Sequence, residues 1–428
     1  MFATLRQRDF GLLWLAGLVS VAGDFAFVTA LPLHVYRLTD STLATAGTFI
    51  AYFLPGVLIG SVAGVFVDRW DRKRTMVVAD LARAVVLLPL LVAPDALVAI
   101  YAVTAALGTI GPFFGPAEGA LLPTLVGEDR LVPANALNSL NDNLGMLLGP
   151  AFGALLYAEL GIGGVVLVNA ASYIGSALLI RLIAADARPA RSDRSGEEVA
   201  VGSAWTRMVS EWRAGLRVVQ HDRTLSVLFV SWSFGGISEG FFLTLGLTPL
   251  VLDVLGGEPA QVGWLGTSQA VGGLIAGVVI ARFGRRLAAR RLFGGGLLGV
   301  GIADFGSFNS RRLAGPGTPA VLVSMGWNFL AGFPAVAGST GNQSLIQTRT
   351  VDAYRGRVFG ALRAVIGIAM IVGFGLAGVL GDALDLVLVL SVSATIRMLG
   401  GIVALALLPR EAPDAQPAEP AESRAPVA

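Results

Sequence analysis

Carboxylates inside long apolar segments are the side chains of this chain that could do chemistry. Asp24 and Glu239 each lie near the middle of an apolar run. An ionisable group at mid-bilayer costs about 2.5–3.5 kcal/mol on insertion scales, so its presence there suggests a function. In a low-dielectric cavity a carboxylate can load and release a proton near neutral pH, and a cationic substrate would compete for it. The alternative is a carboxyl group that hydrogen-bonds to neighbouring helices for packing.

A second polar group lies where the fourth apolar run leads into the fifth, from Glu118 to an asparagine-rich stretch that contains Asp142. These two carboxylates could contact substrate or protons, but we favour hydrogen bonds between helices. Two further ionisable residues lie inside apolar runs of the sequence. Arg397 lies too deep in the last run to reach the surface, so we expect it to pair with a carboxylate, and Asp304 is the candidate.

A charged cluster follows the second apolar run. Its members are Asp68, Arg69, Arg72 and Lys73, with Asp80 and Arg83 in the next run. Their charge pairs could form in one access state of a two-state carrier and break in the other, which would make the cluster a gate. The alternative is that the basic residues only set topology. For Asp68 we favour the gate, since topology needs cations and not an aspartate.

Enzyme chemistry finds no support in the sequence. The chain has no cysteine and only two histidines, so we expect no metal site and no cofactor. The string Gly236–Gly240 fits a nucleophile elbow, but it lies inside an apolar run rather than a strand-turn-helix. We therefore expect neither an enzyme nor a nucleic-acid-binding protein.

The elements that must position these residues are membrane-spanning helices. Only 14% of the 428 residues are charged and 54% are hydrophobic, which excludes a soluble globular domain of this length. We predict an all-α membrane protein with about twelve transmembrane helices. The predicted spans are Phe10–Tyr36, Leu43–Val67, Met76–Val92, Ala96–Leu121, Leu137–Ala158, Gly163–Ala185, Leu225–Leu250, Gln261–Ala281, Leu292–Phe308, Ala320–Ser339, Arg357–Leu380 and Leu384–Leu408.

The spans fall into two groups of six. We predict an N-terminal bundle over 1–185, a cytoplasmic linker with an amphipathic helix over 186–224, a C-terminal bundle over 225–408 and a disordered tail over 409–428. Nearly all basic residues fall in segments on one side of this map, and the opposite side keeps only Arg37, Arg311 and Arg312. The positive-inside rule then predicts a multi-pass protein of a bacterial cytoplasmic membrane with both termini in the cytoplasm.

The two halves repeat. The segment Gly60–Gly64 and the basic loop after it match Gly273–Gly277 and its loop at one constant offset. Parallel repeats of six spans are how one large class of secondary transporters is built, with substrate handled between the halves.

Several motifs carry a resemblance to a known family. The string Gly64-x-x-x-Asp68-Arg69-x-Asp71-Arg72-Lys73 resembles the loop 2–3 signature of the major facilitator superfamily. Gly145, Gly149, Pro150 and Gly153 resemble the helix 5 motif of its antiporters. Other stretches are similar to the drug:proton antiporter branch that includes macrolide efflux and siderophore (enterobactin) exporters. One departure is that helix 4 has Gly111-Pro112-Phe113 where many proton antiporters carry a membrane-embedded arginine.

The resemblance implies a major facilitator fold of two six-helix bundles and secondary active efflux of small amphipathic or lipophilic molecules. The expected partners are the lipid bilayer, a small-molecule substrate and protons, and the expected state is a monomer. The alternatives are uniport or import of a metabolite, and a non-transporting receptor or scaffold on the same fold. A carrier that uses Asp24 and Glu239 predicts loss of flux on their neutralisation, whereas a scaffold tolerates it.

Overall fold

The computed structural model describes residues 2–67, 69–185, 219–284, 287–350 and 352–410, with Ser210, Trp212, Arg213, Leu216 and Arg217. These residues are helical and contain no strand. Asp68, most of the predicted linker and all of the tail from 411 lie outside the described residues. Of the predicted amphipathic stretch, Val219 is buried against the apolar core of the second half.

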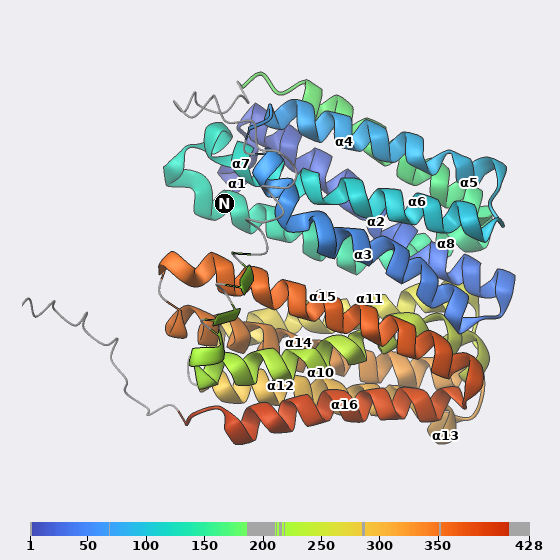
Figure 1. The fold of residues 1–428 in the computed structure, drawn as a ribbon. Helices are drawn as coiled ribbons and strands as arrows, with labels where there is room; N and C mark the ends of the chain where they lie inside the picture. The colour runs from blue at the N-terminus through green and yellow to red at the C-terminus, as the bar shows by residue number, and fades with distance from the viewer. Residues whose placement is uncertain are drawn as a thin grey trace, which may run out of the picture.

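The first half begins with four spans that run back and forth (Figure 1). After the short α1 (Phe2–Leu5), they are α2 (Arg8–Thr39), α3 (Thr42–Val67), the pair α4 (Arg72–Leu87) and α5 (Pro89–Val92), and the series α6 (Leu97–Ile110), η1 (Gly111–Phe113) and α7 (Phe114–Val126). Acidic side chains cap the N-termini of several helices of the chain. Asp71, for example, accepts a hydrogen bond of 3.0 Å from the backbone N–H of Arg74 and so caps α4.

The fifth and sixth spans form one long element, α8 (Leu131–Arg181), which follows η2 (Glu128–Arg130). Its 51 residues would measure about 75 Å if straight, more than twice the bilayer core. The chain reverses instead at Gly161, whose φ of 65° is a backbone conformation that glycine adopts readily. Gly149 and Tyr173 lie twelve residues on either side of it, and they contact neighbouring residues of α2. Therefore α8 crosses the membrane twice.

The second half contributes the other six spans. Its elements are α10 (Arg223–Leu245), η3 (Leu250–Val254), α11 (Pro259–Phe283), α12 (Ala289–Phe308), α13 (Ser310–Ala314), α14 (Thr318–Arg349), α15 (Asp352–Ala383) and α16 (Leu386–Leu407). Ten helical segments of the described chain are long and apolar enough to cross a membrane, with α8 counted once and α12 not counted. The 20 residues of α12 still span about 30 Å. The predicted fold of two six-helix bundles is confirmed.

The two halves meet along two helix pairs, α3 with α15 and α8 with α11. Phe49 of α3 stacks on Phe374 of α15 with ring centroids 5.2 Å apart. In the other pair the Thr267 hydroxyl donates to the backbone carbonyl of Leu147 at 2.9 Å. A Cβ added at Gly263 would lie 2.2 Å from the carbonyl oxygen of Pro150, so the helices touch through their backbones there.

These contacts lie toward the end of the bundle where α3 begins. Asp382 of α15 accepts hydrogen bonds from the backbone N–H groups of Thr42 at 2.6 Å and Leu43 at 3.2 Å. The Tyr36 hydroxyl donates to the Asp253 carboxylate of η3. Both interactions join one half to the other and close this end.

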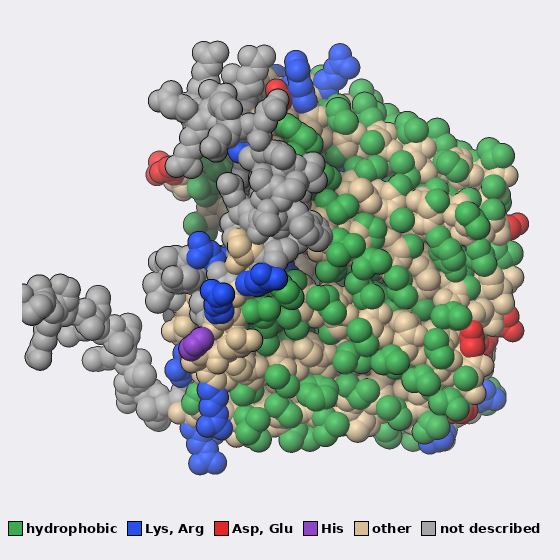
Figure 2. Space-filling model, viewed as in Figure 1, with side chains coloured by type: hydrophobic (Ala, Val, Ile, Leu, Met, Phe, Trp, Pro, Cys, Tyr) green, Lys and Arg blue, Asp and Glu red, His purple; other side chains and the backbone are tan. Residues whose placement is uncertain are grey.

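At the opposite end the halves part. Most Lys and Arg side chains gather there, on the left in Figure 2, with an apolar belt beside them, and we call it the arginine-rich end. In the stretches of α3, α11 and α15 nearest this end, a Cβ added to a glycine would meet nothing within 4 Å. The glycines are Gly60, Gly64, Gly277, Gly356 and Gly360.

Candidate functional site

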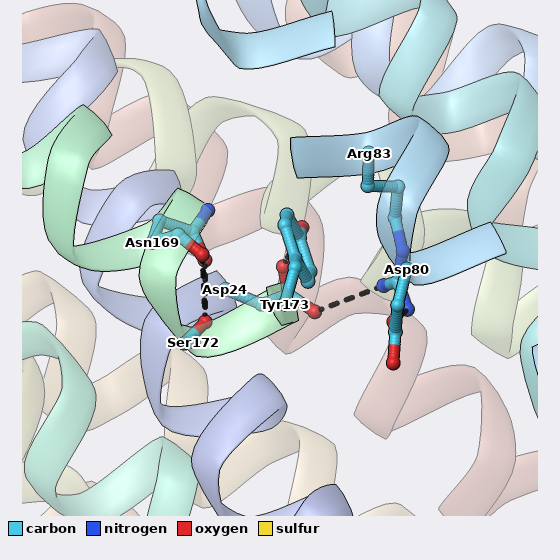
Figure 3. A network of polar contacts seen from close by, with 6 residues as sticks. All are labelled: Asp24, Asp80, Arg83, Asn169, Ser172 and Tyr173. Carbon is cyan, nitrogen blue, oxygen red and sulfur yellow. Dashed lines mark hydrogen bonds and ion pairs between the residues drawn. The ribbon is translucent and has the colours of Figure 1, made fainter. Parts of the chain in front are cut away.

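The first half holds a buried ionic network on three helices (Figure 3). The Arg83 guanidinium of α4 is hydrogen-bonded to Asp80 of the same helix and lies 3.5 Å from the Asp24 carboxylate of α2. The Tyr173 hydroxyl of α8 donates to Asp24. The guanidinium also lies 4.4 Å from the centroid of the Tyr173 ring, a cation–π geometry.

Local sequence explains this geometry. Asp80 and Arg83 are three residues apart on one helix, so their side chains are neighbours on one face. Gly23 stands beside Asp24, and a Cβ there would lie 2.4 Å from the Ser172 hydroxyl of α8. A glycine therefore lets α8 approach α2 closely enough for Tyr173 to reach Asp24.

The second half holds a matching network. Arg397 of α16 lies 2.7 Å from the Glu239 carboxylate of α10 and 3.4 Å from the Asp304 carboxylate of α12. Its Nε also donates to the Ser238 hydroxyl at 3.1 Å. The predicted pairing of Arg397 with Asp304 is confirmed, and the structure adds Glu239 to the same guanidinium.

The two networks have the same charge count. Each contains one guanidinium and two carboxylates, so each carries one surplus negative charge when all groups are ionised. A buried charge is tolerated only when it is paired and hydrogen-bonded. The surplus charge therefore favours a further positive partner, either a proton or a cation.

One carboxylate of each network is accessible. The side chains of Asp24 and Glu239 are 27% and 39% exposed, whereas Asp304 is 4% exposed and Asp80 is fully buried. Asp24 precedes Phe27 on α2 by about one turn, and Glu239 precedes Phe241 on α10. Phe27 and Phe241 belong to one apolar cluster that contains residues of both halves. The accessible carboxylates thus lie next to an apolar seal, on its arginine-rich side.

The predicted gate divides in the structure. Asp80 and Arg83 lie two turns or more inside α4, where the Arg83 guanidinium pairs with both Asp80 and Asp24, so the structure separates them from the loop residues. Lys73 donates to the carbonyl of Ile183 at 2.5 Å, which ties α4 to the end of α8. Arg69 and Arg72 remain at the arginine-rich end, and Asp68 lies outside the described residues.

The other predicted polar residues lie apart from both networks. Glu118 accepts a hydrogen bond of 3.0 Å from the Asn138 amide, as expected for bonding between helices. Asp142 is exposed on α8 and does not contact Asp24 or Glu239. Asn141 donates to the carbonyl of Trp14 at 2.8 Å. These groups lie nearer the arginine-rich end than Asp24 does.

The helix 5 motif has a packing role that the structure shows directly. Cβ atoms at Gly145, Gly149 and Gly153 would lie 2.2–2.4 Å from atoms of α2. Pro150, between them, contacts Gly263 of the other half. The motif therefore forms the surface on which α8 meets both α2 and α11.

Arg83 lies deeper in its span than the charged loop with which the sequence analysis grouped it. It is 6% exposed and lies well inside the third span. A signal was present in the sequence, because Arg83 lies eleven residues into α4 from Arg72, or about 16 Å. Tyr173 and Ser238 were not predicted, since neither carries a charge that sequence alone would single out.

Comparison with known proteins agrees with this architecture. Residues 13–258 and 240–428 match the Major Facilitator Superfamily. The chain is 25% identical over 392 residues to YfiS of Bacillus subtilis (strain 168), an uncharacterized MFS-type transporter, with 90% of each chain covered.

Solved structures show the same fold. A bacterial homologue of the iron transporter ferroportin in an inward-facing state is 18% identical, with a TM-score of 0.73 over 94% of this chain and 99% of that one. A peptide transporter, POT, is 14% identical, with a TM-score of 0.74 over 94% of each chain. The chain belongs to the major facilitator superfamily, a family of membrane transporters and not of enzymes.

Proposed function

We propose that the protein exports small amphipathic or lipophilic molecules by alternating access, in exchange for protons. The observation that carries this proposal is the pair of ionic networks, each with a surplus carboxylate next to the apolar seal. The arginine-rich end faces the cytoplasm on the positive-inside rule. The arrangement described above is then inward-facing, with the outer end closed.

The networks suggest how protons and cargo exchange. A proton on Asp24 or Glu239 removes the surplus charge of its network and weakens its attraction to the guanidinium. A cationic group on the cargo satisfies the same carboxylate in place of the proton. Because both ligands neutralise one site, binding of one favours release of the other, which is the requirement for exchange.

The surroundings of these carboxylates favour a particular cargo. A molecule that enters from the arginine-rich end reaches Asp24 and Glu239 on the near side of the apolar seal that contains Phe27 and Phe241. An apolar body with a positive charge complements this combination. Phe241 and Phe242 are themselves 2% and 7% exposed, so they serve as seal and not as open cavity lining.

The test is efflux of a panel of lipophilic cationic dyes from cells that express wild type, Asp24→Asn or Glu239→Gln, with and without an uncoupler. Glu159→Gln is the matched control, because Glu159 is exposed at the far end of the fifth span. We expect uncoupler-sensitive efflux in wild type and in the control, and loss in at least one network variant at equal membrane expression. Efflux that is insensitive to the uncoupler, or that persists in both Asp24→Asn and Glu239→Gln, contradicts the proposal.

A further inference from the structure

A pocket of about 350 Å³ opens at the closed end of the second half, and none of its lining residues belongs to an ionic network. It is enclosed by η3, by the junction of α12 with α13, and by the start of α16. Charged side chains form its walls: Asp253, Arg311, Arg312 and Asp385. Figure 2 shows acidic and basic side chains together on this end of the second half, at the lower right. We call it the closed-end pocket.

The four charged side chains do not neutralise one another. Arg311 and Arg312 lie on α13, Asp253 lies on η3, and Asp385 is the N-cap of α16. Within the described part of the chain, none of the four forms an ion pair. Two guanidinium groups and two carboxylates therefore face the same pocket, with positive and negative charges held apart.

The two guanidinium groups are positioned but not saturated. Arg311 donates one N–H to the backbone carbonyl of Val254 at 2.9 Å, which ties α13 to η3. Arg312 donates one N–H to the side-chain oxygen of Asn309 at 2.9 Å. A guanidinium carries five N–H donors, and arginine binds a carboxylate or similar anion through two of them in parallel. Both side chains therefore keep donors for an anionic group in the pocket.

The two carboxylates each keep an oxygen for a cationic group. Asp385 uses Oδ1 to accept the backbone N–H of Leu388 at 2.8 Å. Asp253 uses Oδ2 to accept the Tyr36 hydroxyl of the other half. The second oxygen of each carboxylate accepts no hydrogen bond from the described residues. An ammonium group, with three N–H donors, suits these free oxygens.

The floor of the pocket is apolar. Phe308 and Val254 are buried beneath it, and Leu386 and Val387 of α16 are half-buried beside them. A volume of about 350 Å³ lies at the small end of the range of ligand pockets, which is about 300–1,000 Å³. The pocket therefore matches a small molecule that has an apolar body and charged groups of both signs.

We propose that the closed-end pocket binds a small zwitterion, with its anionic group at the two guanidinium groups and its cationic group at the two carboxylates. The inference does not depend on the direction or the cargo of transport. Because Asp253 also joins η3 to Tyr36 of the other half, an occupant holds η3 where the closed end requires it. The ligand therefore binds the closed arrangement better than an open one and shifts the equilibrium toward closure.

The experiment uses the full chain, purified in detergent, with ε-aminocaproate as the probe and isothermal titration calorimetry as the readout. Caproate and hexylamine have a body of the same length and carry only one of the two charges. Arg312→Gln removes a guanidinium, Asp385→Asn removes a negative charge but keeps a capping side chain, and Val387→Trp fills the pocket. Arg37→Gln is the matched control, because Arg37 is exposed at the same end and does not line the pocket.

We expect ε-aminocaproate to bind about fivefold more tightly than either analogue, since an exposed ion pair contributes up to about that factor. Arg312→Gln and Asp385→Asn should each weaken its binding by a similar factor, Val387→Trp should abolish it, and the control should bind as wild type does. Equal binding of the three compounds, no binding of ε-aminocaproate, or binding that is unchanged in all three pocket variants would each overturn the proposal.

Spin labels on the two sides of the closed end test the link to closure, and the chain has no native cysteine that would take up label. Saturating ε-aminocaproate should enlarge the fraction of short distances in the wild type and leave it unchanged in Val387→Trp. Distances in the wild type that do not respond to the bound probe would overturn the claim that the pocket stabilises the closed end.

Discussion

Removal of the Arg397 guanidinium separates the roles of its two carboxylate partners. Arg397→Met keeps an unbranched apolar stem and leaves Asp304 and Glu239 without their cation. Removing one partner of a buried ion pair costs about 3–5 kcal/mol, because the other charge stays buried. We expect most of this cost to arise at Asp304, which is 4% exposed, and little at Glu239, which is 39% exposed.

This difference can be measured in a double-mutant cycle. Asp304→Asn in the Arg397→Met background removes the stranded charge and should recover about 2–4 kcal/mol of the loss. Glu239→Gln in the same background leaves Asp304 stranded and should recover less than about 1 kcal/mol, as for an accessible pair.

The assay is the free energy of unfolding in mixed micelles at neutral pH, followed by far-ultraviolet circular dichroism. Arg130→Met, at an exposed position, should change it by no more than about 0.5 kcal/mol. Equal rescue by the two carboxylate substitutions would refute the reasoning from burial. A loss below about 1 kcal/mol for Arg397→Met alone would refute the claim that the guanidinium neutralises a buried charge.

Three further predictions follow from the helix contacts. Gly153→Ala should destabilise the protein by about 1–3 kcal/mol, because a Cβ there lies 2.3 Å from a backbone oxygen of α2; Gly60→Ala has open space and should not, in the same unfolding assay. Asp382→Ala removes the side chain that caps the start of α3. It should reduce the free energy that favours the closed end by about 0.5–2 kcal/mol, and spin-label distances across that end should become longer. Burial raises the pKa of Asp253, so the protonated form of its carboxyl group stabilises the closed end. This stabilisation is complete below the ordinary pKa near 3.9 and is lost as the pH rises through the raised pKa. The pH dependence of the label distance at this end should disappear in Asp253→Asn. A pH-dependent label distance that persists in that variant would contradict the assignment.

Much of this protein could be predicted from its sequence, because the bilayer penalises local features of the chain. The apolar runs predict the spans, since each backbone polar group must be satisfied inside its own helix. The same penalty singles out Asp24 and Glu239 as unusual. It also requires a carboxylate partner for Arg397, so the pairing with Asp304 could be predicted from the sequence. The repeat of the two halves was also visible in the sequence.

Tertiary structure decided which charges share a partner and which glycines touch a helix. Arg83 belongs with Asp24 only because α4 and α2 both pack on α8, and no spacing along the chain encodes that contact. The glycines of α3 and of α8 have the same four-residue spacing, yet Gly149 is packed and Gly60 faces open space. The reason is physical: insertion into a bilayer depends on each segment alone, whereas contact between segments depends on how the halves are arranged in a given access state.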